Sequence, residues 1–287
     1  MIVSATIDGR HEKLVGPPEA LVPWWSIGKT VLAAAAFRLA DQGRLDLDAP
    51  VTGKPFTARQ LLAHTAGVPN YGHLAAYHEA VARGDAAWPV EELLVRTRAD
   101  ELLFMPGQGW SYSNVGYLFI RQLIERATDS ELRSALHVTV FAPLGLHAVM
   151  TRRRDDMDRL LWRGLKDYDP NWVYHGLVVG TPADAARFLD RLFTTPFLSD
   201  ASRQAMFDAA PITFDLPNRP FGKPTAGTGL MIDPQGPLGL WYGHSGGGPG
   251  SVSAVYRFAN TGRVVAAFAD NEDDGALERA VLELARA

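Results

Sequence analysis

Ser26 and Lys29 stand three residues apart at the start of an apolar, alanine-rich run over residues 30–37. On a helix, residues i and i+3 lie on the same face, one turn apart. The pattern therefore places a hydroxyl beside an amine at the first turn of a buried helix. An amine in that place can take the proton of the hydroxyl and convert a weak nucleophile into a strong one. Because this spacing also arises by chance, other residues have to support it.

A second motif, Tyr112-Ser113-Asn114, lies between a glycine-rich loop at residues 106–109 and a helical pattern that starts at Val115. A phenol and an amide two residues apart in a loop can point into the same cavity. The phenol can relay a proton, and the amide can bind a substrate carbonyl. The alternative is a packed tyrosine beside an asparagine that caps the helix.

A third motif, His244-Ser245-Gly246-Gly247, follows a predicted strand. Small residues there allow a substrate backbone to lie along the strand edge. The N–H group of Gly247 can then join that of Ser26 in binding a developing oxyanion. The alternative is a glycine-rich hairpin that carries a surface histidine.

Together, and in this order, the three motifs resemble those of the serine β-lactamase and penicillin-binding protein superfamily. The chain is most similar to the class C β-lactamase-related branch, which includes esterases, D-peptidases and amidases and has Tyr-x-Asn as its second motif. Segments at residues 61–68, 141–146 and 176–184 also resemble that branch. The resemblance covers nearly the whole chain.

The resemblance implies a role for each residue of the first two motifs. Ser26 is the nucleophile that becomes acylated, and Lys29 is its proton partner. Tyr112 is the other candidate base, and it also protonates the leaving group. Asn114 orients the substrate amide or ester.

In the third motif, the resemblance places His244 where the family usually has lysine, with Ser245 and Gly246 completing the motif. Gly247 takes the oxyanion-hole position together with Ser26. An imidazole can be neutral near pH 7, so a permanent charge for binding a substrate carboxylate is not assured. β-Lactams and cell-wall peptides carry that carboxylate, whereas esters need no such anchor. The chain also has no identifiable glutamate dedicated to deacylation.

Composition excludes several classes of function. The chain has 287 residues, a net charge of -4 and no cysteine. The charge gives no basis for binding nucleic acid or an anionic membrane, and without cysteine there is no disulfide, thiolate nucleophile or cysteine-ligated zinc. The histidines, including His64, lack metal-ligand spacing and are interpreted as core, cap or surface residues, so we expect no metal and no cofactor. With neither a leader nor a membrane-length apolar run, a cytoplasmic, soluble protein is expected, of open oligomeric state.

The predicted elements place strands at both ends of the chain. A turn at Asp8-Gly9 joins strands predicted over residues 1–7 and 11–15, and a helix is predicted over residues 26–42. The middle of the chain is mostly helical in pattern. Beyond residue 225 the period is that of strands, with tight turns that indicate antiparallel pairing. We predict these strands at residues 228–232, 238–244, 251–258 and 263–269, with a turn at 246–250 and a closing helix at 275–287.

This order predicts an α/β (α+β) fold with one antiparallel sheet built from both termini, flanked by helices, and with an inserted all-helical lobe. The resemblance makes it β-lactamase/transpeptidase-like. We expect a sheet lobe from residues 1–46 and 215–287 and a helical lobe from residues 47–214, with the active site at their interface. The aromatic residues Trp24, Trp25, Trp172 and Tyr174 are interpreted either as walls of an acyl pocket or as core.

The function expected from these motifs is that of a serine hydrolase that cleaves a small-molecule ester, amide or β-lactam through an acyl-enzyme on Ser26. One alternative is a penicillin-binding sensor or scaffold that is acylated without turnover. Another is an acyltransferase, because the same acyl-enzyme can react with an alcohol or amine in place of water.

Overall fold

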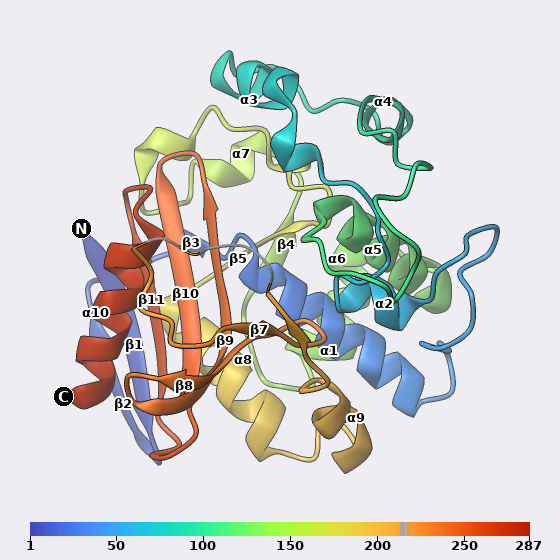
Figure 1. Cartoon of the computed structure of the whole chain (residues 1–287). Helices are drawn as coiled ribbons and strands as arrows, with labels where there is room; N and C mark the ends of the chain where they lie inside the picture. Colours follow the sequence, from blue (N-terminus) through green and yellow to red (C-terminus); the bar gives the residue numbers. More distant parts are fainter. Residues whose placement is uncertain (213–215, 217) are drawn as a thin grey trace.

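The structure is a computed structural model that describes residues 1–212, 216 and 218–287. A large antiparallel sheet lies beside a group of helices, and both ends of the chain lie on the sheet side (Figure 1). In the described part of the chain, this sheet has eight strands in the order β2-β1-β11-β10-β9-β8-β7-β6. The strands are β1 (Ile2–Asp8), β2 (His11–Val15), β6 (Ala210–Pro211), β7 (Thr225–Ala226), β8 (Met231–Gly236), β9 (Gly239–Gly248), β10 (Ser251–Phe258) and β11 (Val264–Ala269).

Strands from the two ends of the chain pair with each other in the sheet, as predicted. β1 pairs with its hairpin partner β2 on one side and with β11 on the other, in a register that places Ile2 opposite Ala269. The side chains of β11 are all buried, which explains its unbroken apolar sequence. The sheet built from both termini is confirmed.

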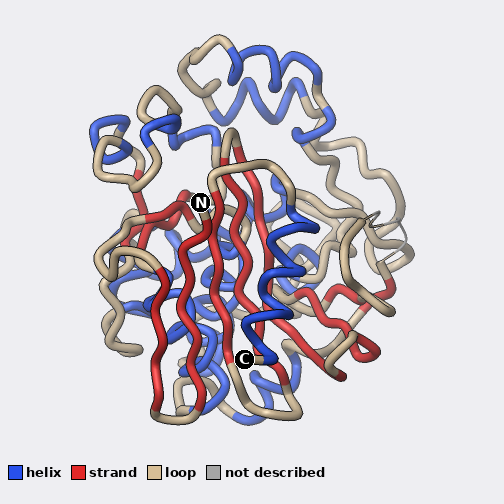
Figure 2. Tube along the Cα trace, turned by 90° about the vertical axis from the view of Figure 1, so that its left-hand side faces the viewer, coloured by secondary structure: helices blue, strands red, loops and turns tan. Residues whose placement is uncertain are grey.

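Helices cover both faces of this sheet. α10 (Asp274–Arg286) runs across β9, β10 and β11 on one face (Figure 2), where an apolar layer includes Trp241 and Tyr256. On the other face, α8 (Pro182–Thr194) packs against β1, β10 and β11, and α1 (Ile27–Asp41) packs against β9 and β10. Each face of the sheet therefore has its own hydrophobic core.

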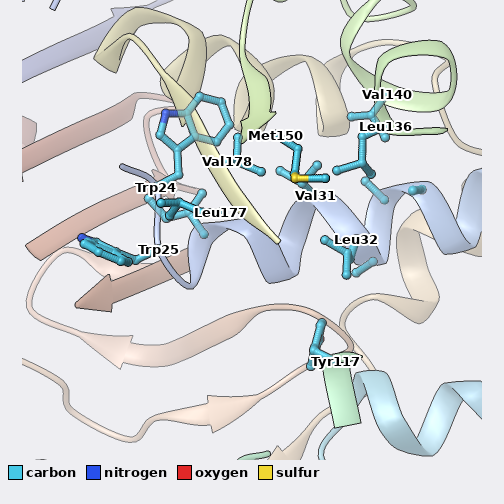
Figure 3. Close-up of a cluster of buried hydrophobic side chains, with 14 of the residues drawn as sticks. Trp24, Trp25, Val31, Leu32, Tyr117, Leu136, Val140, Met150, Leu177 and Val178 are labelled. Atoms are coloured by element: carbon cyan, nitrogen blue, oxygen red, sulfur yellow. The ribbon is translucent and has the colours of Figure 1, made fainter. Parts of the chain in front are cut away.

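α1 is mostly apolar, and residues 27–37 are buried on every side of the helix, Lys29 and Thr30 included. Val31 extends toward Met150 on one side of the helix, while Leu32 extends toward Tyr117 on another (Figure 3). A helix that is apolar on all sides is stable only in the interior of a molecule. The first turn of α1 is therefore held rigidly between the sheet and the other helices.

The remaining helices are α2 (Ala58–Leu62), α3 (Ala75–Ala82), α4 (Val90–Arg96), α5 (Asn114–Thr128), α6 (Leu132–Leu136), α7 (Arg154–Met157) and α9 (Asp200–Ala205), with short helical turns at Tyr71–His73, His137–Phe141, Arg163–Leu165 and Pro170–Trp172. Of these helices, α2, α5 and α6 lie close to α1, while α3, α4 and α7 lie at the top of the view and α9 at the bottom (Figure 1). Among the described residues, no helix is long and apolar enough to cross a lipid bilayer.

The lobe predicted to be all-helical contains strands, which corrects that prediction. β4 (Val149–Thr151) and β5 (Leu177–Gly180) lie within it and form a second antiparallel sheet with β3 (Val22–Pro23). Short, buried strands have no alternation long enough to separate them from helix by pattern. α8 also belongs to this stretch of sequence but packs on the large sheet. The expected boundary between residues 214 and 215 lies outside the described residues.

Two strand limits also differ from the prediction. β8 does not end at Asp233 but continues to Gly236 through an irregular register. The Asp233 carboxylate accepts hydrogen bonds from the N–H groups of Gly222, Lys223 and Gln235 and from the Trp241 indole, so a buried acid is tolerated inside the strand.

β9 is longer than predicted because residues 246–248 belong to the strand and not to the turn. Gly248 still pairs with Ser251, which leaves only Pro249 and Gly250 in the turn. The glycines at residues 246–248 therefore belong to the strand itself, where Gly246 and Gly248 lie against Trp25 and Ser26 at the start of α1.

Candidate active site

The hydroxyl of Ser26 lies at the N-terminus of α1 and accepts two hydrogen bonds. Lys29 Nζ donates one at 3.0 Å, and the Tyr112 hydroxyl donates the other at 2.8 Å. The first contact follows from the i, i+3 spacing on α1, whereas the second joins residues 86 positions apart. The structure therefore brings together the three residues that the sequence predicted to be catalytic.

Burial determines the protonation states of these partners. Lys29 is fully buried, and desolvation lowers its pKa well below the usual value, which favours the neutral amine. Burial raises the pKa of Tyr112, while its hydrogen bond to Ser26 acts in the opposite direction. Ser26 Oγ thus faces a protonated phenol and an amine whose neutral form, with a lone pair able to accept a proton, is favoured by burial.

Asn114 is the first residue of α5 but not its cap. Ser113 is the cap, because its hydroxyl accepts a hydrogen bond from the N–H of Gly116 at 2.9 Å. The backbone N–H of Asn114 donates to the side chain of Asn70. The alternative of an asparagine cap is wrong, and the Asn114 side chain lines a small pocket that also borders Ser26.

His64 is a site residue that the sequence analysis placed among the core, cap or surface histidines. Its Nδ1 accepts a hydrogen bond from the N–H of Ser113 at 3.1 Å, and its ring lies 4.5 Å from that of Tyr112. Burial is the largest cause that lowers its pKa well below the usual value, and Lys29 adds to the effect when it is protonated. A neutral His64 therefore supports the Tyr112 ring. The family resemblance of residues 61–68 was the one available signal.

His244 is buried, so the alternative of a surface histidine is wrong. Its Nδ1 lies 2.5 Å from the carbonyl oxygen of Ser245, an acceptor that requires the proton to be on Nδ1. Burial, and then the charge of Lys29, lower the pKa of His244 to about 3. The imidazole is therefore neutral at pH 7, and it provides no permanent positive charge.

Gly246 lies where β9 passes closest to α1. A Cβ atom on this residue would be 2.3 Å from the backbone nitrogen of Ser26, a distance that no side chain can occupy. The last pairing of β8 with β9 joins Met231 to Gly243, so within the described part of the chain the β9 edge beyond Gly243 carries no strand from β8. This edge lies beside Ser26 and is open for a substrate backbone.

With this geometry in view, comparison with known proteins identifies the family. The chain matches the Beta-lactamase family over residues 8–286. The chain belongs to the Beta-lactamase family. Penicillin-binding protein 4* of Bacillus subtilis is 24% identical over 91% of the chain, and Esterase EstB of Burkholderia gladioli is 32% identical over 42% of the chain. The chain spans 63% and 36% of the lengths of these two relatives.

Solved structures of the same fold include a D-stereospecific amidohydrolase from Streptomyces, with a TM-score of 0.83, 25% identity, and coverage of 98% of this chain and 92% of that one. The D-amino acid amidase of Ochrobactrum anthropi has a TM-score of 0.84 at 22% identity, with 100% and 94% covered, and supports the fold alone. The β-lactamase/transpeptidase-like fold is confirmed.

In this member of the Beta-lactamase family, a cavity of about 570 Å³ opens beside Ser26. Ser26, Tyr112, His244, Ser245, Gly246 and Gly247 all border it, which places most of the predicted site around one space. Two charged residues that the sequence analysis missed, Arg219 and Asp274, also border it. No motif marks either of them, because each reaches the cavity only through the folding of distant segments.

A smaller pocket of about 70 Å³ lies on another side of Ser26 and is walled by aromatic rings. Trp25 and Trp172 border it together with Asn114, which agrees with a pocket for an acyl group. Trp24 and Tyr174 do not border it; they are buried in the core, so for these two the alternative interpretation is correct.

Proposed function

We propose that this chain is a serine hydrolase that cleaves esters or amides through an acyl-enzyme on Ser26. The observation that carries the proposal is the pair of hydrogen bonds that Lys29 and Tyr112 donate to the same Ser26 oxygen, at 3.0 and 2.8 Å. A nucleophile within hydrogen-bond reach of a neutral base and a proton donor is the arrangement that acyl transfer needs.

In acylation, Ser26 Oγ attacks the substrate carbonyl carbon while its proton passes to the neutral Lys29 amine. The carbonyl oxygen becomes an oxyanion, which the N–H groups of Ser26 and Gly247 bind; each such donor is worth roughly 3 kcal/mol. The bond to the leaving group then breaks, and Tyr112 gives its proton to the departing oxygen or nitrogen. The Lys29 ammonium returns a proton to the Tyr112 oxygen.

Deacylation repeats these steps with water as the nucleophile. Water attacks the ester of Ser26 and gives its proton to Lys29, and the acid product leaves as Ser26 Oγ regains a proton through Tyr112. No further carboxylate is needed, because the same two residues act in both halves of the reaction.

The proposed substrates are small esters and amides with a modest acyl group, because the aromatic pocket beside Asn114 is small. β-Lactams carry a carboxylate, and the neutral His244 gives it no fixed positive charge to bind. We therefore propose that β-lactams are cleaved weakly or not at all.

The test compares the wild-type chain with Ser26→Ala on p-nitrophenyl acetate and butyrate. We expect the variant to lose at least about 10³-fold in kcat/KM, because it lacks the attacking oxygen. Ser134→Ala, on the exposed face of α6, is the matched control and is expected to retain full activity. Equal rates from wild type and Ser26→Ala would refute the proposal.

Intact-mass measurement after incubation with a penicillin distinguishes the hydrolase from the alternative function, a penicillin-binding sensor. A stable adduct on Ser26, together with absent ester turnover, would favour a penicillin-binding sensor. Ester turnover without a lasting adduct supports the hydrolase.

A further inference from the structure

The large cavity contains one charged side chain whose charge is already neutralised. Arg219 Nε donates to Glu278 at 2.8 Å, a second guanidinium nitrogen donates to the other oxygen of the same carboxylate, and Ser245 Oγ accepts a further bond at 2.7 Å. The Glu278 side chain is fully buried and also accepts a hydrogen bond from the Tyr256 hydroxyl. This bidentate pair holds Arg219 in place and cancels its charge.

Asp274 differs from Arg219 because its carboxylate has no such partner among the residues that the structure describes. It stands in the first turn of α10 and borders the same cavity. One of its oxygens lies 3.8 Å from the point where a Cβ atom on Gly247 would stand, which places the carboxylate next to the proposed oxyanion hole. Among the described residues, no side chain or N–H group forms a hydrogen bond or ion pair with it.

The carboxylate of Asp274 is affected by burial and by the nearby Arg219. Burial raises the pKa of Asp274, and Arg219 opposes that rise. Lys29 and His244 have lowered pKa values, so neither offers a fixed cation to the carboxylate. A partly buried carboxylate without a partner in the protein attracts a cation from outside it.

The half of the substrate that meets Asp274 follows from the two pockets. Asn114, which would orient the acyl group, borders the small aromatic pocket, whereas Tyr112, which would protonate the leaving group, borders the large cavity. Asp274 borders the large cavity only. The leaving group therefore occupies the space in which the unpaired carboxylate stands.

Resting on the function proposed above, we propose that Asp274 determines specificity by binding an ammonium group carried on the leaving-group half of the substrate. Trp110 and Tyr112 also border the cavity, and aromatic faces accommodate alkylammonium groups well. A leaving group with a negative charge meets repulsion at the same place.

The experiment uses two thioesters with the same acetyl group, acetylthiocholine and 3,3-dimethylbutyl thioacetate, which differ only in a quaternary nitrogen or carbon. Thiol release can be followed with a disulfide reagent because the chain has no cysteine. We expect wild-type kcat/KM to be about tenfold or more higher for the cationic substrate. In Asp274→Asn this preference should disappear, with turnover of the neutral thioester retained as proof of folding.

Glu283→Gln, an exposed acid-to-amide change on the same helix, is the matched control and should keep the wild-type preference. Asp274→Lys should reverse the preference, toward the anionic 4-(acetylthio)butanoate. Equal wild-type rates on the two thioesters, or a preference that survives in Asp274→Asn, would overturn the role of Asp274 while leaving the hydrolase intact. Absence of turnover on both thioesters and on p-nitrophenyl acetate would overturn both proposals.

Discussion

At the scale of single residues, burial rather than neighbouring charge is the main cause of the shifted pKa values in this site. Lys29 is buried in α1, and desolvation lowers its pKa and so favours its neutral form. His244 is neutral at pH 7 for the same reason. The chemistry of the cleft therefore depends on a base created by its surroundings.

The lowered pKa of Lys29 predicts how the reaction depends on pH. The rate requires neutral Lys29, so kcat/KM for p-nitrophenyl acetate should rise with pH through the lowered pKa of Lys29 and then level off. Tyr112 has a raised pKa and remains a proton donor throughout the neutral range. A pH–rate profile measures this, and Lys29→Arg, which cannot lose its proton, should be about 10³-fold slower at every pH.

The pH–rate profile of His244→Asn shows whether the acidic limb comes from the titration of Lys29 or of His244. The pKa of His244 is about 3, so the acidic limb should stay in place when this residue is replaced. A limb that vanished in His244→Asn would assign the titration to the histidine and contradict the role given to Lys29.

At the scale of elements, the site depends on how closely β9 can approach α1. Residues 246–248 are glycines, and a Cβ atom on Gly248 would collide with the Trp25 ring at 2.5 Å. The Ser253 hydroxyl on β10 bonds both the Trp24 and the Gly246 carbonyl oxygens, which ties the strand to the chain just before the helix. This contact places the strand edge beside the nucleophile.

Gly246→Ala should therefore reduce kcat/KM by about 10²-fold or more and lower the melting temperature. The new Cβ atom would lie 2.3 Å from the Ser26 nitrogen and 3.0 Å from its Cα, so backbone has to move. Ester kinetics and a thermal melt measure both effects. Gly164→Ala, where a Cβ atom meets nothing within 4 Å, is the control. Wild-type activity in Gly246→Ala would show that this approach is not needed.

At the scale of the whole molecule, the two hydrophobic cores enclose several titratable groups around the cleft. His64, His175 and His244 are all buried, and burial is the largest cause of the lowered pKa of each. The folded protein thus keeps neutral three imidazoles that become protonated in the unfolded chain. The packing that creates the site also makes it sensitive to acid.

The free energy of unfolding should therefore fall as the pH is lowered. For a histidine with a lowered folded pKa, the unfolded chain binds more protons, so stability is complete above the unfolded pKa and declines below it. Each such group contributes up to about 1.4 kcal/mol per pH unit between its unfolded pKa, about 6.5, and its folded pKa. Urea unfolding at about pH 7.5 and pH 5.5 measures the slope.

His244→Asn should reduce the change of unfolding free energy with pH by the contribution of one histidine. His11→Asn, at an exposed position, should leave that change as it is in the wild type. Stability that is independent of pH across this interval would contradict the burial of these imidazoles.

Local patterns in the sequence predicted much of this protein. The helix at residues 26–42 and the Lys29 contact with Ser26 follow from the geometry of one turn, so spacing alone determined them. The strands at both ends of the chain were also predicted. Near the C-terminus, β10 and β11 were recognisable by their long apolar sequences. The short strands β4 and β5 were missed, because three or four buried residues carry no period.

The tertiary structure alone decided which groups converge and in what charge state. Tyr112 reaches Ser26 across 86 positions, and Arg219 reaches Glu278 across 59, through the packing of elements that no local spacing encodes. The neutrality of His244 and the raised pKa of Asp274 likewise depend on desolvation, which only the folded chain provides. These are properties of a three-dimensional environment, and a residue acquires them only once the chain has folded around it.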